Sequence, residues 1–363
     1  MTHAIIVGTH LDLSGPLAQW GQATRNGLRM GIDEANAEGG MQGRQIRLIV
    51  EDDRYDPAAA ASAVRKLVNE DGVFAILSPL GTPTVEASMT QALNHGVLHL
   101  FPLMADAQSF HPLHPLKFAV TPPYANDIAA GLDYLLTNSR KRKVAVLYET
   151  NAFGAGILDG AQTALARRHL KPAAVVGFPA GATNFRGEIA KLKAARADIV
   201  VLGTVVQDTL EVLRAVRTSA WHPLFFLCSA ACYTPETTTL GGTLVEGLYA
   251  VADVPIPYAN DPNAKLRGWA ESYQRKFGAP ATLQALQGYL NARLFAGAVR
   301  KTGVLTQVNY ARTLETMAPW TDERLDGLPV KFTPEDHLGV HAGFLARVQK
   351  GRWVTQTASL EAN

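Results

Sequence analysis

Few residue pairs in this chain have the types and spacing that metal chemistry requires. His111 and His114 lie three residues apart, but the proline after each places them in a loop rather than on one face of a helix. His337 and His341 lie four residues apart, without the intervening Glu of a zinc-protease helix. The sequence therefore predicts no metal site and no cofactor.

Redox and catalytic motifs are equally scarce. Cys228 and Cys232 lack the CxxC redox spacing, so we expect ordinary, partly buried thiols. The chain has no G-x-S-x-G nucleophile elbow, no dinucleotide fingerprint and no P-loop. Asp12 and Asp106 fall in loops after predicted strands, so an enzyme that uses one of them stays open as an alternative to a binding protein.

The segment 77–84 has the strongest signature of a binding loop. A strand ends there, Gly81 follows in the loop, and a helix begins with Thr82 as its expected N-cap. Free backbone N–H groups and the positive end of a helix dipole form a site for a carboxylate. The earlier connection 8–21 is long for a strand-to-helix loop, and it presents Trp20 where a ligand would lie.

Alternating elements must position these loops. Runs of Val, Ile and Leu alternate with amphipathic helical stretches, which is typical of βαβ units and a parallel, doubly wound sheet. In the first part, strands are predicted at 4–8, 45–51, 73–77, 97–100 and 116–120, and helices at 22–38, 57–69 and 83–95. After Pro122 and Pro123, strands are predicted at 144–148, 173–178, 199–203 and 224–228, and helices at 152–169, 184–196 and 207–219. A second proline-marked link at 251–257 precedes predicted helices at 262–277 and 282–301 and strands at 330–332, 343–349 and 352–354.

This order indicates a chain that crosses more than once between two α/β domains, with a ligand cleft at the carboxyl ends of the strands. A length of 363 residues fits two domains, and 47% hydrophobic with 18% charged residues is typical of a globular protein. A net charge of +2 provides no electrostatic footprint for nucleic acid. No helix-turn-helix or basic segment precedes the first strand, which disfavours a repressor.

No apolar run reaches about 18 residues, so no transmembrane helix is expected. No leader-like segment precedes the first predicted strand. The sequence is therefore compatible with a mature periplasmic form or with a cytoplasmic protein.

Four segments carry a resemblance to a known family. They are 13–21 (LSGPLAQWG), 31–44 (GIDEANAEGGMQGR), 52–57 (DDRYDP) and 181–185 (GATNF). In order and over nearly the whole chain, they resemble the type I periplasmic-binding-protein family, specifically the branched-chain-amino-acid-type solute-binding proteins of ABC transporters. The resemblance implies an α/β fold with two doubly wound, Rossmann-like lobes joined by a three-crossover hinge.

The resemblance also implies where the chain divides and what it does. The expected lobes are 1–121 plus 252–328 and 122–251 plus 329–363, with crossovers near 121–123, 251–255 and 327–331. We expect a monomer that is not an enzyme, that closes on a small ligand in the periplasm, and that delivers it to the membrane subunits of an ABC permease.

Site residues follow from matching the loops to the family. Amino-acid binders hold the ligand carboxylate with hydroxyls on the first two loops; here Gly81 and Ala105 occupy two such positions, and Thr82 could partly substitute. The acidic residue that receives the ligand ammonium is missing from 228–231, which disfavours an α-amino acid because an unpaired buried ammonium costs several kcal/mol. The candidate ligand-binding residues are Trp20, Leu80, Gly81, Thr82, Met104, Ala105, Tyr124, Phe153, Thr204, Val205, Ser229 and Ala230.

The leading prediction is a binding protein for an aromatic or hydrophobic carboxylic acid. The loop Gly81–Thr82 would hold the carboxylate, and Trp20 and Phe153 would stack on the apolar body. Within the same family, a binder or cytoplasmic sensor of small amides, urea or amino acids is the alternative. An enzyme on a doubly wound fold is the alternative from another class.

Overall fold

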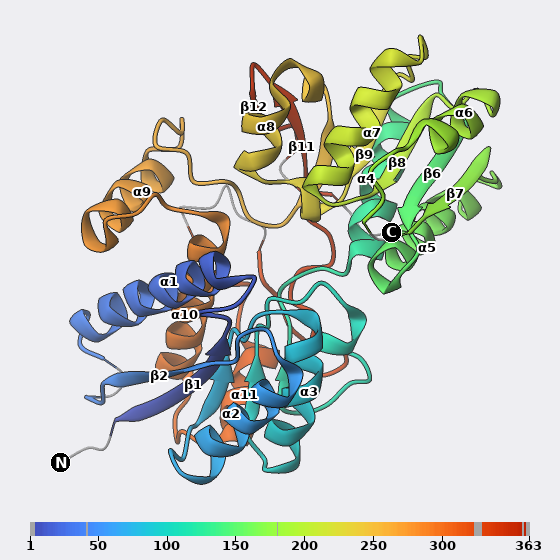
Figure 1. The fold of residues 1–363 in the computed structure, drawn as a ribbon. Helices are drawn as coiled ribbons and strands as arrows, with labels where there is room; N and C mark the ends of the chain where they lie inside the picture. The colour runs from blue at the N-terminus through green and yellow to red at the C-terminus, as the bar shows by residue number, and fades with distance from the viewer. Residues whose placement is uncertain (1–3, 41–42, 180, 323–328, 358, 361–363) are drawn as a thin grey trace. The chain divides into compact units, whose positions relative to one another are not determined.

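The computed structural model describes residues 4–40, 43–179, 181–322, 329–357 and 359–360. The chain divides into two units, and it passes from one to the other three times (Figure 1). Unit 1 comprises Met1–Thr121 and Pro257–Val340, and unit 2 comprises Pro122–Ile256 and His341–Asn363. None of the helices among the described residues is long and apolar enough to cross a membrane.

Unit 1 contains a five-stranded sheet in the order β2-β1-β3-β4-β5, with every neighbouring pair parallel. Its strands are β1 (Ile5–Leu11), β2 (Ile46–Asp52), β3 (Ala75–Leu77), β4 (Leu98–Leu100) and β5 (Lys117–Phe118). Its helices are α1 (Ala18–Ala37), α2 (Pro57–Asn69), α3 (Thr82–Asn94), α9 (Ala264–Phe277), α10 (Leu283–Lys301) and α11 (Gln307–Thr316), with a short 3-10 turn, η1 (Ala107–Ser109). The central strands β3 and β4 are fully buried, as continuous apolar runs require.

Helices from distant parts of the sequence pack side by side in unit 1. Figure 1 shows α1 beside α10, and these two helices form the most extensive helix pair of the unit. A Cβ atom on Gly27 of α1 would collide with the backbone of Ala285, and one on Gly288 of α10 would lie 2.5 Å from the Thr24 carbonyl oxygen. Glycine at these positions therefore permits the close approach of the two helix backbones.

Unit 2 contains a seven-stranded sheet in the order β12-β11-β10-β9-β8-β6-β7. Its strands are β6 (Val144–Glu149), β7 (Ala174–Phe178), β8 (Ile199–Gly203), β9 (Phe225–Cys228), β10 (Tyr249–Ala252), β11 (Phe344–Gln349) and β12 (Arg352–Thr355). Strands β6 to β10 pair in parallel, and β11 and β12 are added antiparallel. Its helices are α4 (Tyr124–Thr137), α5 (Ala152–Ala166), α6 (Arg186–Ala194), α7 (Val206–Thr218) and α8 (Pro235–Gly241), with 3-10 turns η2 (Ala230–Cys232) and η3 (Gly242–Val245).

The predicted fold class, α/β with two parallel-dominated sheets, is confirmed. Sequence reasoning missed helices α4, α8 and α11 and placed β10 in a link. The predicted strand 330–332 is present only as an isolated bridge between Trp320 and Val330.

The boundaries of the two units differ from those predicted at the later crossings. Residues 252–256 belong to unit 2, and 329–340 belong to unit 1. The second difference has a clear cause, because Leu338 bridges to Ala119 and Phe332 stacks on Phe101 with ring centroids 6.0 Å apart. The predicted crossover at 327–331 lies partly outside the described residues, which resume at 329.

Candidate ligand-binding loops

The candidate residues of unit 1 all lie at the carboxyl edge of its sheet. In a sheet of this order the loops after β1 and β3 leave toward opposite faces, and ligands bind outside such a switch point. Trp20, in the first turn of α1, is 42% exposed. Leu80 bridges to Leu103, and the Gly81 N–H donates to the Leu103 carbonyl oxygen at 3.3 Å, so the loops after β3 and β4 are joined.

The start of α3 corrects one sequence prediction. The N-cap is Gly81, with φ +99° and no side-chain capping hydrogen bond, and Thr82 is the first helical residue. Thr82 therefore does not cap the helix, and it is exposed to solvent. Ala105 is partly exposed at the loop after β4, whereas the Leu80 and Met104 side chains are buried, Met104 against Val85 in a small apolar cluster.

The two carboxylates proposed for an enzyme alternative are committed to loop structure. Asp12 is buried and accepts hydrogen bonds from the backbone N–H groups of Ser14, Gly15 and Leu17, at 3.2, 2.5 and 2.6 Å. Asp106 caps η1 by accepting from the Gln108 N–H at 2.8 Å. Asp12 therefore shapes the long loop that leads to α1.

Apart from Tyr124, which begins α4, the candidate residues of unit 2 also follow the carboxyl ends of parallel strands. Tyr124, the first residue of α4, packs edge to face against Phe153 of α5, with ring centroids 5.1 Å apart. Val205 is 43% exposed as the N-cap residue of α7. The buried Thr204 hydroxyl shares a 2.6 Å hydrogen bond with Thr209. These contacts bring one aromatic pair together and leave the Thr204 side chain inside the unit.

Ser229 and Ala230 lie within a cysteine-bounded turn, which corrects a second prediction. Ser229 is buried and accepts a hydrogen bond from the Ala231 N–H at 3.3 Å. Cys228 and Cys232 are not free thiols: they are buried and joined by a disulfide, with Cα atoms 6.4 Å apart. The turn η2 lies between the two cysteines and brings them together. The prediction of free thiols was wrong because the CxxC criterion does not cover cysteines four residues apart.

Two carboxylates at this edge were missed by sequence reasoning, which searched only 228–231. Glu149 is the last residue of β6, and Asp208 lies in the first turn of α7. Burial raises the pKa of Asp208, and the nearby Glu149 carboxylate raises it further. An acidic residue at the end of a strand and another in a first helical turn were the available signal.

A buried polar chain behind the loops of unit 1 was also missed. His10 Nδ1 lies 2.6 Å from Asp53 Oδ2, and His10 Nε2 lies 2.7 Å from the Ser88 hydroxyl. All three side chains are fully buried. The residues are far apart in the sequence, so no local motif marks them.

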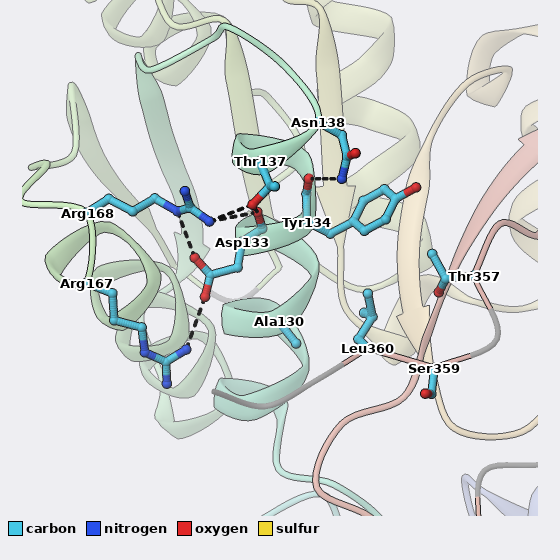
Figure 2. A pocket seen from close by; sticks show the side chains of 10 residues that line it. All are labelled: Ala130, Asp133, Tyr134, Thr137, Asn138, Arg167, Arg168, Thr357, Ser359 and Leu360. Atoms are coloured by element: carbon cyan, nitrogen blue, oxygen red, sulfur yellow. Dashed lines mark hydrogen bonds and ion pairs between the residues drawn. The ribbon is translucent and has the colours of Figure 1, made fainter.

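Unit 2 also has a surface pocket of about 510 Å³ between α4, the end of α5 and the segment after β12. Figure 2 shows Arg167 and Arg168 converging on Asp133, with ion-pair distances of 3.1 and 2.9 Å. Tyr134 and Leu360 lie on the other side of the pocket (Figure 2). The arginine charges are thus partly neutralised by the Asp133 carboxylate. Among the described residues, no group of three or more His, Cys, Asp or Glu is placed to hold a metal ion.

Comparison with known proteins gives the same fold and a family. The sequence profile described as "Periplasmic binding protein" matches residues 4–352. The chain is 25% identical to Leu/Ile/Val-binding protein homolog 7 of Brucella melitensis over 309 residues, covering 82% of this chain and 77% of that protein. It is 24% identical to the leucine-, isoleucine-, valine-, threonine-, and alanine-binding protein of Pseudomonas aeruginosa, covering 80% and 76%.

Two solved structures illustrate the likeness in fold. A putative branched-chain amino acid ABC transporter protein from Rhodospirillum rubrum matches with a TM-score of 0.81 at 22% identity, covering 97% of this chain and 100% of that one. A fatty acid ABC transporter substrate-binding protein from Thermomonospora curvata matches with a TM-score of 0.81 at 22% identity, covering 99% and 93%.

Two units with parallel-dominated sheets and exposed loops at the carboxyl edges form the architecture of the family whose profile matches the chain. The chain belongs to the periplasmic binding protein family. It is accordingly a substrate-binding protein and not an enzyme. Membership implies a periplasmic location, a small-molecule ligand and permease partners.

Proposed function

We propose that this protein binds a small aromatic or hydrophobic carboxylic acid and delivers it to an ABC permease. The observation that supports this most directly is the start of α3. Gly81 leaves the helix N-terminus without a side-chain cap, and the exposed Thr82 places a hydroxyl beside it. Helix N-terminal N–H groups and a hydroxyl are donors suited to a carboxylate.

Apolar surface near the loops supports the second part of the proposal. Trp20 and Val205 are each more than two-fifths exposed, although large apolar side chains lose free energy in water. Phe153 is already held against Tyr124, so its ring is ordered before any ligand arrives. A flat apolar body would gain free energy by stacking on the exposed ring of Trp20 or on the ordered ring of Phe153.

An amino acid is the second candidate, and a specific observation favours it. Glu149 and Asp208 provide carboxylates at the strand ends of unit 2, although 228–231 has none. Burial and the nearby Glu149 carboxylate raise the pKa of Asp208, and an ammonium group beside Asp208 would favour its charged form. The curated relatives described above are named as binders of leucine, isoleucine and valine.

A thermal-shift panel followed by calorimetry distinguishes these candidates. The panel holds benzoate, trans-cinnamate, short fatty acids, leucine, valine, small amides and urea. A ligand present at a hundred times its Kd adds about 2.7 kcal/mol of stability, which is a readily measured shift. Stabilisation by benzoate, trans-cinnamate or short fatty acids, without stabilisation by leucine or valine, supports the first candidate. Stabilisation by leucine or valine alone refutes it in favour of the second.

Paired variants then locate the head group of the ligand. Thr82→Ala removes the exposed hydroxyl at the start of α3, and Thr90→Ala removes an exposed hydroxyl from the other end of the same helix. We expect the first variant to weaken binding of the best carboxylate several-fold and the second to leave its Kd unchanged. Equal Kd values for both variants would contradict the proposed position of the carboxylate.

A further inference from the structure

Tyr55 lies in a turn whose shape is imposed by its neighbours. It follows β2 and precedes α2, at the carboxyl edge of the unit 1 sheet. Arg54 and Tyr55 both have left-handed backbone angles, with φ of 52° and 59°. Such angles cost free energy in residues other than glycine and persist only where surrounding contacts enforce them.

Asp53 supplies those contacts. Its Oδ1 atom accepts a hydrogen bond from the Tyr55 N–H at 2.8 Å, and its own N–H donates to the Leu11 carbonyl oxygen at 3.0 Å. Its Oδ2 atom lies 2.6 Å from His10 Nδ1, and His10 Nε2 lies 2.7 Å from the Ser88 hydroxyl on α3. The position of Tyr55 is therefore fixed through a fully buried chain that ties β1, the end of β2 and α3 together.

The Tyr55 ring lies directly against the proposed carboxylate loop. A Cβ atom added to Gly81 would be 2.6 Å from Tyr55 Cε2 and 2.9 Å from the Thr84 hydroxyl. Only glycine leaves room for this contact, which explains why the α3 N-cap is Gly81 rather than a hydroxyl or carboxamide residue. The ring thus forms a wall beside Gly81, next to the exposed Thr82.

The Tyr55 hydroxyl is a suitable donor at this position. Tyr55 is partly exposed, and its hydroxyl makes no hydrogen bond to any residue within the described ranges. Burial raises the pKa of this phenol, and Asp53 and Asp12 raise it further, so it keeps its proton at neutral pH. The Asp12 carboxylate is itself held by backbone N–H groups.

We infer that Tyr55 is a specificity-determining residue of the binding site, and that its hydroxyl donates a hydrogen bond to the carboxylate of the ligand beside Gly81. This inference rests on the proposed function. It adds a hydrogen-bond donor on the loop after β2. None of the twelve candidate residues from the sequence lies on that loop.

The test compares Tyr55→Phe with the wild-type protein by calorimetry. The probe is the carboxylate of the panel that binds wild type most tightly, together with its primary amide. A hydrogen bond to a charged group is worth about 1.5–3 kcal/mol and one between neutral groups about 0.5–1.5 kcal/mol. We therefore expect Kd to rise tenfold or more for the carboxylate, to rise less for the amide, and the unfolding midpoint to stay unchanged.

Tyr134→Phe is the matched control. Tyr134 is also a partly buried tyrosine, and it lies in the unit 2 pocket of Figure 2 rather than at the strand ends. A carboxylate Kd within twofold of wild type for Tyr55→Phe, or an equal loss for the control, would overturn the inference while leaving the proposed function intact. If wild type binds no carboxylate of the panel, the proposed function fails and the inference fails with it.

Discussion

The buried chain from Asp53 through His10 to Ser88 makes a quantitative prediction about stability. Ser88→Ala removes the hydroxyl that lies 2.7 Å from His10 Nε2, in a region fully excluded from water. The alanine side chain has no polar atom that could form a hydrogen bond with that ring nitrogen. The remaining hydrogen bond of Ser88, to the Val85 carbonyl oxygen of the same helix, is lost as well.

The expected cost follows from the unsatisfied nitrogen. Leaving one buried polar group without its partner costs about 1–3 kcal/mol. Alanine has a higher helix propensity than serine, which offsets a few tenths of a kcal/mol within α3. We expect a net loss of about 2 kcal/mol in the free energy of unfolding of unit 1. For a unit of about 200 residues this lowers Tm by roughly 4–8 °C.

Urea denaturation followed by circular dichroism, together with hydrogen exchange of peptides from α3, measures the effect. Thr90→Ala is the control, because it removes an exposed hydroxyl from the same helix and should change stability by less than about 0.5 kcal/mol. If Ser88→Ala behaves like this control, the hydrogen bond to His10 does not stabilise the unit and the reasoning is refuted.

Three further predictions concern single buried or strained residues. Burial, assisted by His10 and Lys117, lowers the pKa of His99 to about 3, so only the unfolded state binds its proton between pH 6.5 and 3. Urea titrations should therefore show wild type losing about 2 kcal/mol between pH 7 and pH 5, and His99→Leu losing less. Burial raises the pKa of the Asp127 carboxyl, so the contribution of this group to stability is present below about pH 4 and is lost as the pH rises through its folded-state pKa. The stability gained by Asp127→Asn should therefore grow from pH 5 to pH 8, and a pH-independent difference would contradict this. Gly81→Ala should lower Tm by the equivalent of about 1–3 kcal/mol, because alanine at φ +99° is strained; an unchanged melting curve would be inconsistent with that backbone.

Local patterns were enough to predict much of the fold. The helix 57–69 was predicted with its exact bounds because Asp56 caps it and Pro57 begins it. Strand β8 at 199–203 was also exact, because its residues form an uninterrupted apolar run before Gly203. Helix α4 was missed because the prolines before it were interpreted only as a link.

The site was harder to predict because its details depend on residues distant in sequence. The N-cap of α3 was assigned to Thr82 from local propensity, whereas the Tyr55 ring requires glycine one residue earlier. An acidic residue was expected only after β9, whereas Glu149 ends β6 and Asp208 lies in the first turn of α7, after β8. Spacing rules built on known motifs do not describe such arrangements.

The pairing of α1 with α10 has a consequence for how the protein is made. A ribosome that has just completed the first segment of unit 1 must still add about 160 residues before α10 begins, which takes on the order of 8–30 s. Until then the surface of α1 around Thr24, Gly27 and Gly31 lacks the helix that packs against it in the folded protein. The sheet of unit 2 is likewise incomplete until β11 has been synthesised, because β11 pairs with β10 and lies near the end of the chain. Neither sheet can reach its final packing before most of the chain has been synthesised. A chain that terminates early would therefore expose apolar surface that favours aggregation.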